Sequence, residues 1–136
     1  MGLKLERHEE KGTVTIPVTP YREARTRYEE RFAGRDYFME NLMVSVFFHM
    51  HLPDMRSPEL LWKSYVNFCN LYAMFRFLAV MSCREEAAGD REELFRMIVF
   101  ASRSLIHNGQ RQEQLRDELF QNESATLAHM AILLGG

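Results

Sequence analysis

Arg76 is the residue whose position most suggests chemistry, because it interrupts the most apolar stretch of the sequence, Leu71 to Met81. A buried charge without a partner is very costly, so this guanidinium must meet an acid or several carbonyl oxygens. Glu40, in a neighbouring apolar segment, is a natural partner for an internal salt bridge. The other structural interpretation is a charge at the edge of the domain. The functional hypothesis is a guanidinium that awaits the carboxylate or phosphate group of a ligand.

Arg103 and His107 form a second pair of candidates, because residues four apart lie on the same face of a helix. This face is opposite Leu94, so solvent is its default environment. The alternative is that a further part of a larger protein packs there and makes both side chains pocket residues. Phe100 beside them favours a covered face, because large exposed apolar side chains mark contact surfaces.

The spacing of the remaining residues supports neither a metal site nor covalent catalysis. His49 and His51 are two apart, so in a helix they point about 200° away from each other and cannot share a metal ion. The sequence has no CxxC pair, no Gly-rich phosphate loop, no G-x-S-x-G elbow and no H-E-x-x-H pair. We therefore predict no metal site in this chain, and its catalytic residues, if any, stay unknown.

The composition describes one globular domain. The chain has 136 residues, of which 46% are hydrophobic, 26% charged and 12% aromatic, which excludes intrinsic disorder, collagen-like repeats and a disulfide scaffold. The formal net charge of −2 shows no positive excess, and no helix-turn-helix with a basic face appears. We therefore predict no nucleic-acid partner.

The cysteines and the chain start indicate the compartment. Cys69 and Cys83 fall in one predicted helix, about 21 Å apart at about 1.5 Å rise per residue, so they cannot form a disulfide with each other. Free buried thiols suit a reducing cytosol. The first eight residues are too charged for a signal peptide, and no apolar stretch reaches the roughly 20 residues of a membrane span. We expect a cytoplasmic protein with no membrane partner.

The elements that would position these residues are helices. The pattern predicts an all-α fold, an irregular bundle of five to six helices around a long central helix, with a short extended N-terminal arm. We divide the chain into an arm over 1–19 and a helical domain over 20–136. The predicted helices span about 20–32, 36–52, 57–84, 90–107, 110–121 and 124–134.

Three local features carry further expectations. The strand-like segment Thr13 to Thr19 has no predicted partner, so it would pair with another chain or with a missing upstream segment. The segment Leu42 to Phe48 is apolar nearly all round, which predicts burial on most sides. Ser57 followed by Pro58 starts the central helix.

Caps are predicted for the shorter helices as well. Thr19 would cap the first helix, Asp90 to Glu93 form a capping box, Asn108 closes the fourth helix and Ser124 caps the last.

Three stretches of the sequence stand in a distinctive order: Tyr28 to Leu42, the aromatic helix from Tyr65 to Leu78, and Phe100 to Asn108. This order resembles the C-terminal helical half of the flagellin lysine N-methylase family. That family shows an E-N-Y-L-like start, a phenylalanine-rich helix that ends near F-P, and an S-R-x-x-x-H helix. The resemblance covers residues 21–134. Leu42 and Met43 follow Asn41 where the family has an aromatic residue, and the family's cysteine-rich N-terminal half has no counterpart here.

The resemblance implies methyl transfer from S-adenosylmethionine to lysine side chains of flagellin, in a full-length bacterial protein whose N-terminal cysteines carry a metal cluster. This chain then resembles a C-terminal fragment, or a stand-alone relative without the cluster, with no cofactor of its own. By the resemblance Glu40, Asn41, Arg103 and His107 would help to form a substrate or cofactor pocket at the junction with the missing half. Arg76 is a further candidate for such a pocket, because of its place in the apolar stretch and not because of the resemblance.

Two other functions stay open. The chain could be a helical interaction module that dimerises or docks a partner through an aromatic, methionine-rich surface, for which its nine methionines are suited. The chain could instead be a bundle that binds an apolar small molecule between its helices, but the sequence shows no polar residues that would anchor such a ligand.

Overall fold

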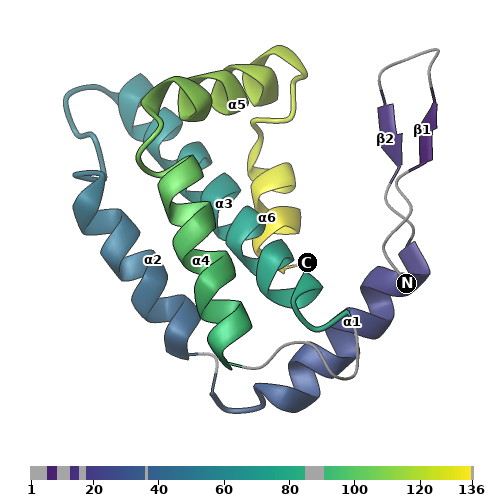
Figure 1. Ribbon diagram of the computed structural model, residues 1–136. Helices are drawn as coiled ribbons and strands as arrows, with labels where there is room; N and C mark the ends of the chain where they lie inside the picture. The colour runs from purple at the N-terminus through teal and green to yellow at the C-terminus, as the bar shows by residue number, and fades with distance from the viewer. Residues whose placement is uncertain (1–5, 9–12, 16–17, 36, 85–90, 136) are drawn as a thin grey trace.

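The all-α fold is confirmed. The computed structural model describes residues 6–8, 13–15, 18–35, 37–84 and 91–135, and within these it contains six helices preceded by a two-stranded hairpin (Figure 1). The strands are β1 (Glu6–His8) and β2 (Thr13–Thr15). The helices are α1 (Val18–Arg31), α2 (Tyr37–His49), α3 (Pro58–Met81), α4 (Arg91–Leu105), α5 (Gly109–Gln121) and α6 (Leu127–Gly135).

The longest helix, α3, is the centre of the bundle, as predicted. It contacts each of the other five described helices, and among the described residues α4 with α5 is the only other helix pair with substantial contact. Its side chains Leu71, Phe75 and Val80 are completely or almost completely buried. Removal of this much apolar surface from water is the main force that holds the other helices against α3.

The helix α2 is less buried than its apolar sequence suggested. Met39, Met43 and Val46 face the core, but Val44 is 50% and Phe48 73% exposed. The prediction of burial on most sides is wrong because α3 is the one helix with substantial contact to α2 in the described part of the chain. Val44 and Phe48 therefore lie on a face of α2 that the other described helices leave largely open.

The strand that seemed to lack a partner has one within the chain. The residues Thr13–Thr15 pair antiparallel with Glu6–His8, so the expectation of a partner in another chain or in a missing segment is wrong. In Figure 1 the hairpin stands apart from the helices, beyond the start of α1. The sequence did not indicate this partner, because the charged residues Glu6, Arg7 and His8 gave no strand signal.

The start of the central helix agrees with its predicted cap. The Ser57 hydroxyl accepts a hydrogen bond from the backbone N–H of Leu60 at 3.2 Å, and Pro58 occupies the first turn. This helix ends at Met81, so Cys83 lies just beyond it; both cysteines are buried and free, as expected.

Other predicted helix ends are displaced. The helix α1 begins at Val18, so Thr19 lies inside it and is not its cap. Asn108 opens α5, because its side chain accepts from the N–H of Arg111, and it does not close α4, which ends at Leu105. The predicted capping box at Asp90 lies outside the described residues.

The last helix also begins later than predicted. Glu123 adopts a left-handed conformation with φ of 55°, and the N–H of Ser124 then donates to Leu119 O at 2.9 Å. Ser124 therefore belongs to the turn that ends α5. Thr126 is the cap of α6, because its hydroxyl accepts from the N–H of His129 at 3.3 Å. None of the helices in the described ranges has the length and apolar character needed to cross a bilayer.

Candidate functional site

An open groove of about 980 Å³ lies between α2 and α3, with contributions from α1 and α6. One wall is a stripe of α2 formed by Tyr37, Glu40, Val44 and Phe48, which are three or four residues apart and so share a helix face. The opposite wall comes from α3 through Phe68, Tyr72 and Arg76, which are spaced four apart. Leu134 of α6 lies beside this second wall. We call this feature the α2–α3 groove.

Aromatic rings dominate the lining of the α2–α3 groove. Seven of its sixteen lining residues are Phe or Tyr, whereas aromatic residues make up only 12% of the chain. On the α1 side the rings of Tyr28 and Phe32 lie 5.1 Å apart between centroids. Across the groove Phe47 meets Phe68 edge to face at 6.1 Å, which joins α2 to α3. The groove therefore presents fixed aromatic surface to whatever enters it.

The α2–α3 groove carries two carboxylates in different states. Glu29 is engaged, because its Oε1 accepts from Arg25 Nε at 2.8 Å. Glu40 is exposed, and no cation within 4.0 Å pairs with it among the described residues. Glu40 is thus the carboxylate of this groove that is available to a cationic ligand.

Arg76 lies in the same groove, but its predicted salt bridge with Glu40 is wrong. The Nη1 atom of Arg76 donates instead to the Tyr72 hydroxyl at 3.2 Å and to the carbonyl oxygen of Leu134 at 3.4 Å. The side chain is half-buried, because Arg76 sits where α3 borders the open groove, so one neutral hydroxyl and one carbonyl with solvent suffice for it. A fully buried guanidinium would have needed an acid.

The five predicted site residues do not form one site. Glu40 and Arg76 share the α2–α3 groove. Asn41 is exposed on α2 beside Glu40 but does not line the groove, and its carbonyl oxygen accepts from the Ser45 hydroxyl at 3.0 Å. Arg103 and His107 are exposed on α4 and directly after it, away from the groove lining.

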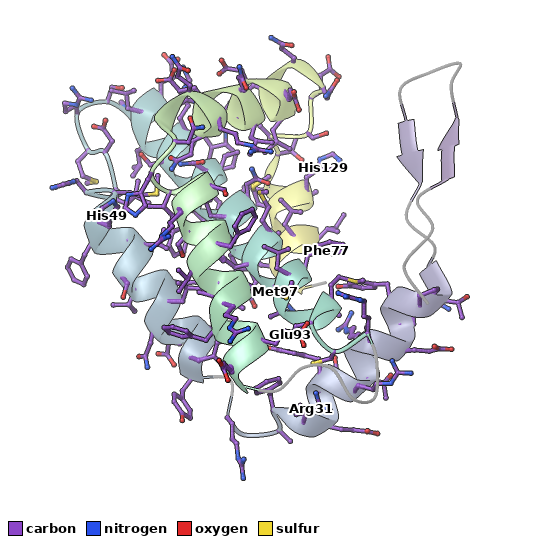
Figure 2. The ribbon with its side chains drawn as sticks, viewed as in Figure 1. Arg31, His49, Phe77, Glu93, Met97 and His129 are labelled. Carbon is purple, nitrogen blue, oxygen red and sulfur yellow. The ribbon has the colours of Figure 1, made fainter. Side chains whose placement is uncertain are left out.

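His107 instead meets a histidine of another helix. Its ring lies edge to face against that of His49 at the end of α2, with 5.1 Å between centroids. Figure 2 shows His49 at the end of α2 that approaches the end of α4. This contact escaped the sequence analysis because the two residues are far apart in the chain and nothing in their local spacing relates them.

The exposed surface of α4 carries both aromatic and charged side chains. Phe95 and Phe100 are both largely exposed, and Arg96 pairs with Glu92 one turn earlier. The described elements leave both phenylalanine side chains more than half exposed. The prediction that solvent is the default environment of this face is therefore consistent with the structure, and the hypothesis of a covering partner stays a prediction.

The described residues do not fit a metal cluster. No group of three or more His, Cys, Asp or Glu side chains gathers within the ranges that the structure describes. Burial raises the pKa of the Cys69 thiol, and a hydrogen bond from Tyr65 only partly opposes this effect. A thiol with a raised pKa is a poor metal ligand and a poor nucleophile at neutral pH.

A second cleft, of about 620 Å³, lies between the loop after α2 and the start of α5. Its cations are mostly engaged: Arg56 pairs with Asp54 at 2.7 Å, and Lys63 pairs with Glu59 at 2.7 Å. The Nε atom of Arg116 is buried there without a hydrogen-bond partner, but it forms an ion pair with Asp117 Oδ1 at 3.6 Å. No local pattern in the sequence indicates this cleft, because its lining comes from segments that are far apart in the chain.

Comparison with known proteins gives one match. The family model of the FliB lysine N-methylase C-terminal domain matches residues 2–133. No curated protein and no solved structure matches the chain. The match spans nearly the whole chain and includes both walls of the α2–α3 groove.

Proposed function

The chain belongs to the FliB lysine N-methylase C-terminal domain family, and from this premise we propose that it serves in methyl transfer from S-adenosylmethionine to lysine side chains of flagellin. In this proposal the domain contributes a substrate or cofactor pocket, and the transfer chemistry resides in another part of the full-length enzyme. The observation that carries the proposal is the family match over residues 2–133.

The α2–α3 groove supports a binding role for this domain. It joins aromatic surface to one available carboxylate, Glu40, and this combination suits a cation with an apolar stem. Both reactants of lysine methylation have such a form, since the lysine side chain ends in an ammonium and the methyl donor contains a sulfonium.

The partners and location follow from the same proposal. The domain would pack against the cysteine-rich half of the enzyme, and its exposed α4 face with Arg103 and His107 is a candidate for that contact. A metal cluster would be held by that half. The two free buried thiols, Cys69 and Cys83, support a location in the reducing cytoplasm.

Calorimetric titration of the purified chain tests the proposed function. One titration uses purified flagellin and a second uses S-adenosylmethionine. Saturable heat with either reactant is the expected result. No heat with either reactant, at concentrations up to the millimolar range, would contradict the proposal.

A non-enzymatic interaction or dimerisation module is the second candidate function. The observation in its favour is the set of large apolar side chains left exposed outside the groove on α4 and α6, namely Phe95, Phe100, Leu127 and Ile132. Light scattering over a range of protein concentrations tests it. A concentration-dependent dimer that gives no heat with flagellin or with S-adenosylmethionine would favour this module over the methylase domain.

A further inference from the structure

We propose that the α2–α3 groove binds the side chain of a substrate lysine, with the Glu40 carboxylate against its ammonium and aromatic rings along its methylene stem. This inference rests on the proposed function, because it identifies which reactant the groove receives. It assigns a role to the carboxylate and the rings that the family match does not assign.

The first argument is the state of Glu40. Its carboxylate lines the groove, is exposed and lacks an ion-pair partner within the described residues, whereas Glu29 of the same groove is held by Arg25 at 2.8 Å. A carboxylate that is already paired offers little to a second cation. An arriving ammonium therefore finds its counter-ion at Glu40, and a charge-assisted hydrogen bond forms there.

The second argument is the arrangement of rings around Glu40. Tyr37 lies one turn before Glu40 on the same face of α2, is 62% exposed and lines the groove. Tyr28 and Phe32 of α1 line the groove from a second element, with their rings 5.1 Å apart. Aromatic faces attract cations and also cover an aliphatic stem, so rings and carboxylate together fit both parts of a lysine side chain.

Arg76 on the opposite wall gives the groove a positive charge that also bears on its ligand. Its guanidinium is fixed by the Tyr72 hydroxyl and the Leu134 carbonyl oxygen, so a positive charge stays at that wall. This charge disfavours a second cation there and attracts a carbonyl or carboxylate group. The groove thus has an anion at its α2 wall and a cation at its α3 wall, which complement the ammonium of a lysine and a carbonyl oxygen of the segment that bears it.

Size and polarity favour a protein segment over S-adenosylmethionine. The groove is open and measures about 980 Å³, which is at the upper end of the range for small-molecule pockets. The adenine, ribose and amino-acid groups of the methyl donor would each need several hydrogen-bonding partners. The charged side chains of the groove are Glu29, Glu40 and Arg76, and the first of these is already paired.

The test is an NMR titration of the isotope-labelled full chain with Nα-acetyl-lysine methylamide. Nα-acetyl-norleucine methylamide is the control probe, because it has the same stem without the ammonium. We expect saturable shifts at the amides of Tyr37 and Glu40 with the lysine probe and about ten-fold weaker binding of the norleucine probe.

Two variants separate the carboxylate from a general charge effect. Glu40→Gln keeps the size of the side chain. It should lower the affinity for the lysine probe about ten-fold and leave the affinity for the norleucine probe unchanged. Glu30→Gln is the matched control, because Glu30 is an exposed glutamate of α1 outside the groove lining, and it should bind both probes as the wild type does. Tyr37→Leu should lower the affinity for the lysine probe a few-fold, since it removes one aromatic face.

The outcomes distinguish this inference from the proposed function. Equal affinity of wild type and Glu40→Gln for the lysine probe would overturn the inference, as would S-adenosylmethionine displacing the probe from the groove with higher affinity. If flagellin bound wild type and Glu40→Gln equally, the inference would fail and the proposed function would stand. If Glu40→Gln lost binding of the lysine probe but neither flagellin nor S-adenosylmethionine gave heat with the wild type, the groove inference would stand and the proposed function would fail.

Discussion

Phe75→Ala tests the packing around α3, on which the groove walls depend. Phe75 is completely buried at the centre of the core cluster that joins α1, α2, α3 and α4. Truncation of a fully buried phenylalanine removes its transfer free energy and leaves a cavity, so we expect a loss of about 3–5 kcal/mol of unfolding free energy. For a domain of this size that corresponds to a fall of roughly 10–18 °C in Tm.

The assay is urea unfolding followed by far-UV circular dichroism, with Phe100→Ala as the control. Phe100 is 73% exposed on α4, so the same truncation there should change the unfolding free energy by less than about 0.5 kcal/mol. A loss below about 1 kcal/mol for Phe75→Ala, or equal losses for the two variants, would refute the central position of α3. If Phe75→Ala does not fold, the milder Phe75→Leu should still lose more than Phe100→Leu.

Three further predictions use the same protein. Arg76→Ala should cost about 1 kcal/mol in urea unfolding, because it removes two hydrogen bonds from a half-buried group; a loss of about 3–5 kcal/mol would reveal a stranded buried acid and contradict the contacts with Tyr72 and Leu134. Ser57→Ala should cost about 1 kcal/mol by loss of the N-cap, while Ser57→Asp should cost much less, and equal losses would argue against this cap. Hydrogen bonds from Arg56 hold the pKa of Asp54 below its ordinary value, so NMR titration of the carboxyl should show a rise in Arg56→Ala. Because the folded-state pKa is lowered, this pair stabilises the protein above the unfolded pKa of Asp54, and the effect disappears as the pH falls through the folded pKa; an unchanged pKa in Arg56→Ala would disprove the contact.

The central helix was predictable because its signals are local. Ser57 and Pro58 mark its start through capping and a fixed φ, and the mostly apolar sequence after Tyr65, interrupted only by Asn67, Asn70 and Arg76, indicates burial. The exposure of α2 was not predictable in the same way. Its sequence is as apolar as that of a buried helix, but burial depends on how many other elements reach it, and that number is set by the whole fold.

Sequence reasoning found two groove residues but not the groove. Glu40 and Arg76 drew attention as charges within apolar segments, and both line the α2–α3 groove. The predicted salt bridge between them does not form. Tertiary packing places the guanidinium of Arg76 against the Tyr72 hydroxyl instead, and local sequence does not reveal such a contact. The spacing of Phe68, Tyr72 and Arg76 by four was present in the sequence and could have indicated one wall.

The central claim is that this domain presents an acidic, aromatic groove to a lysine of the protein substrate. Its most direct test compares calorimetric titrations of the chain with purified flagellin and with the same flagellin after chemical acetylation of its lysines. The account predicts binding of unmodified flagellin that weakens about ten-fold or more on acetylation, because acetylation removes the ammonium charge. Equal binding of the two flagellin preparations would contradict it.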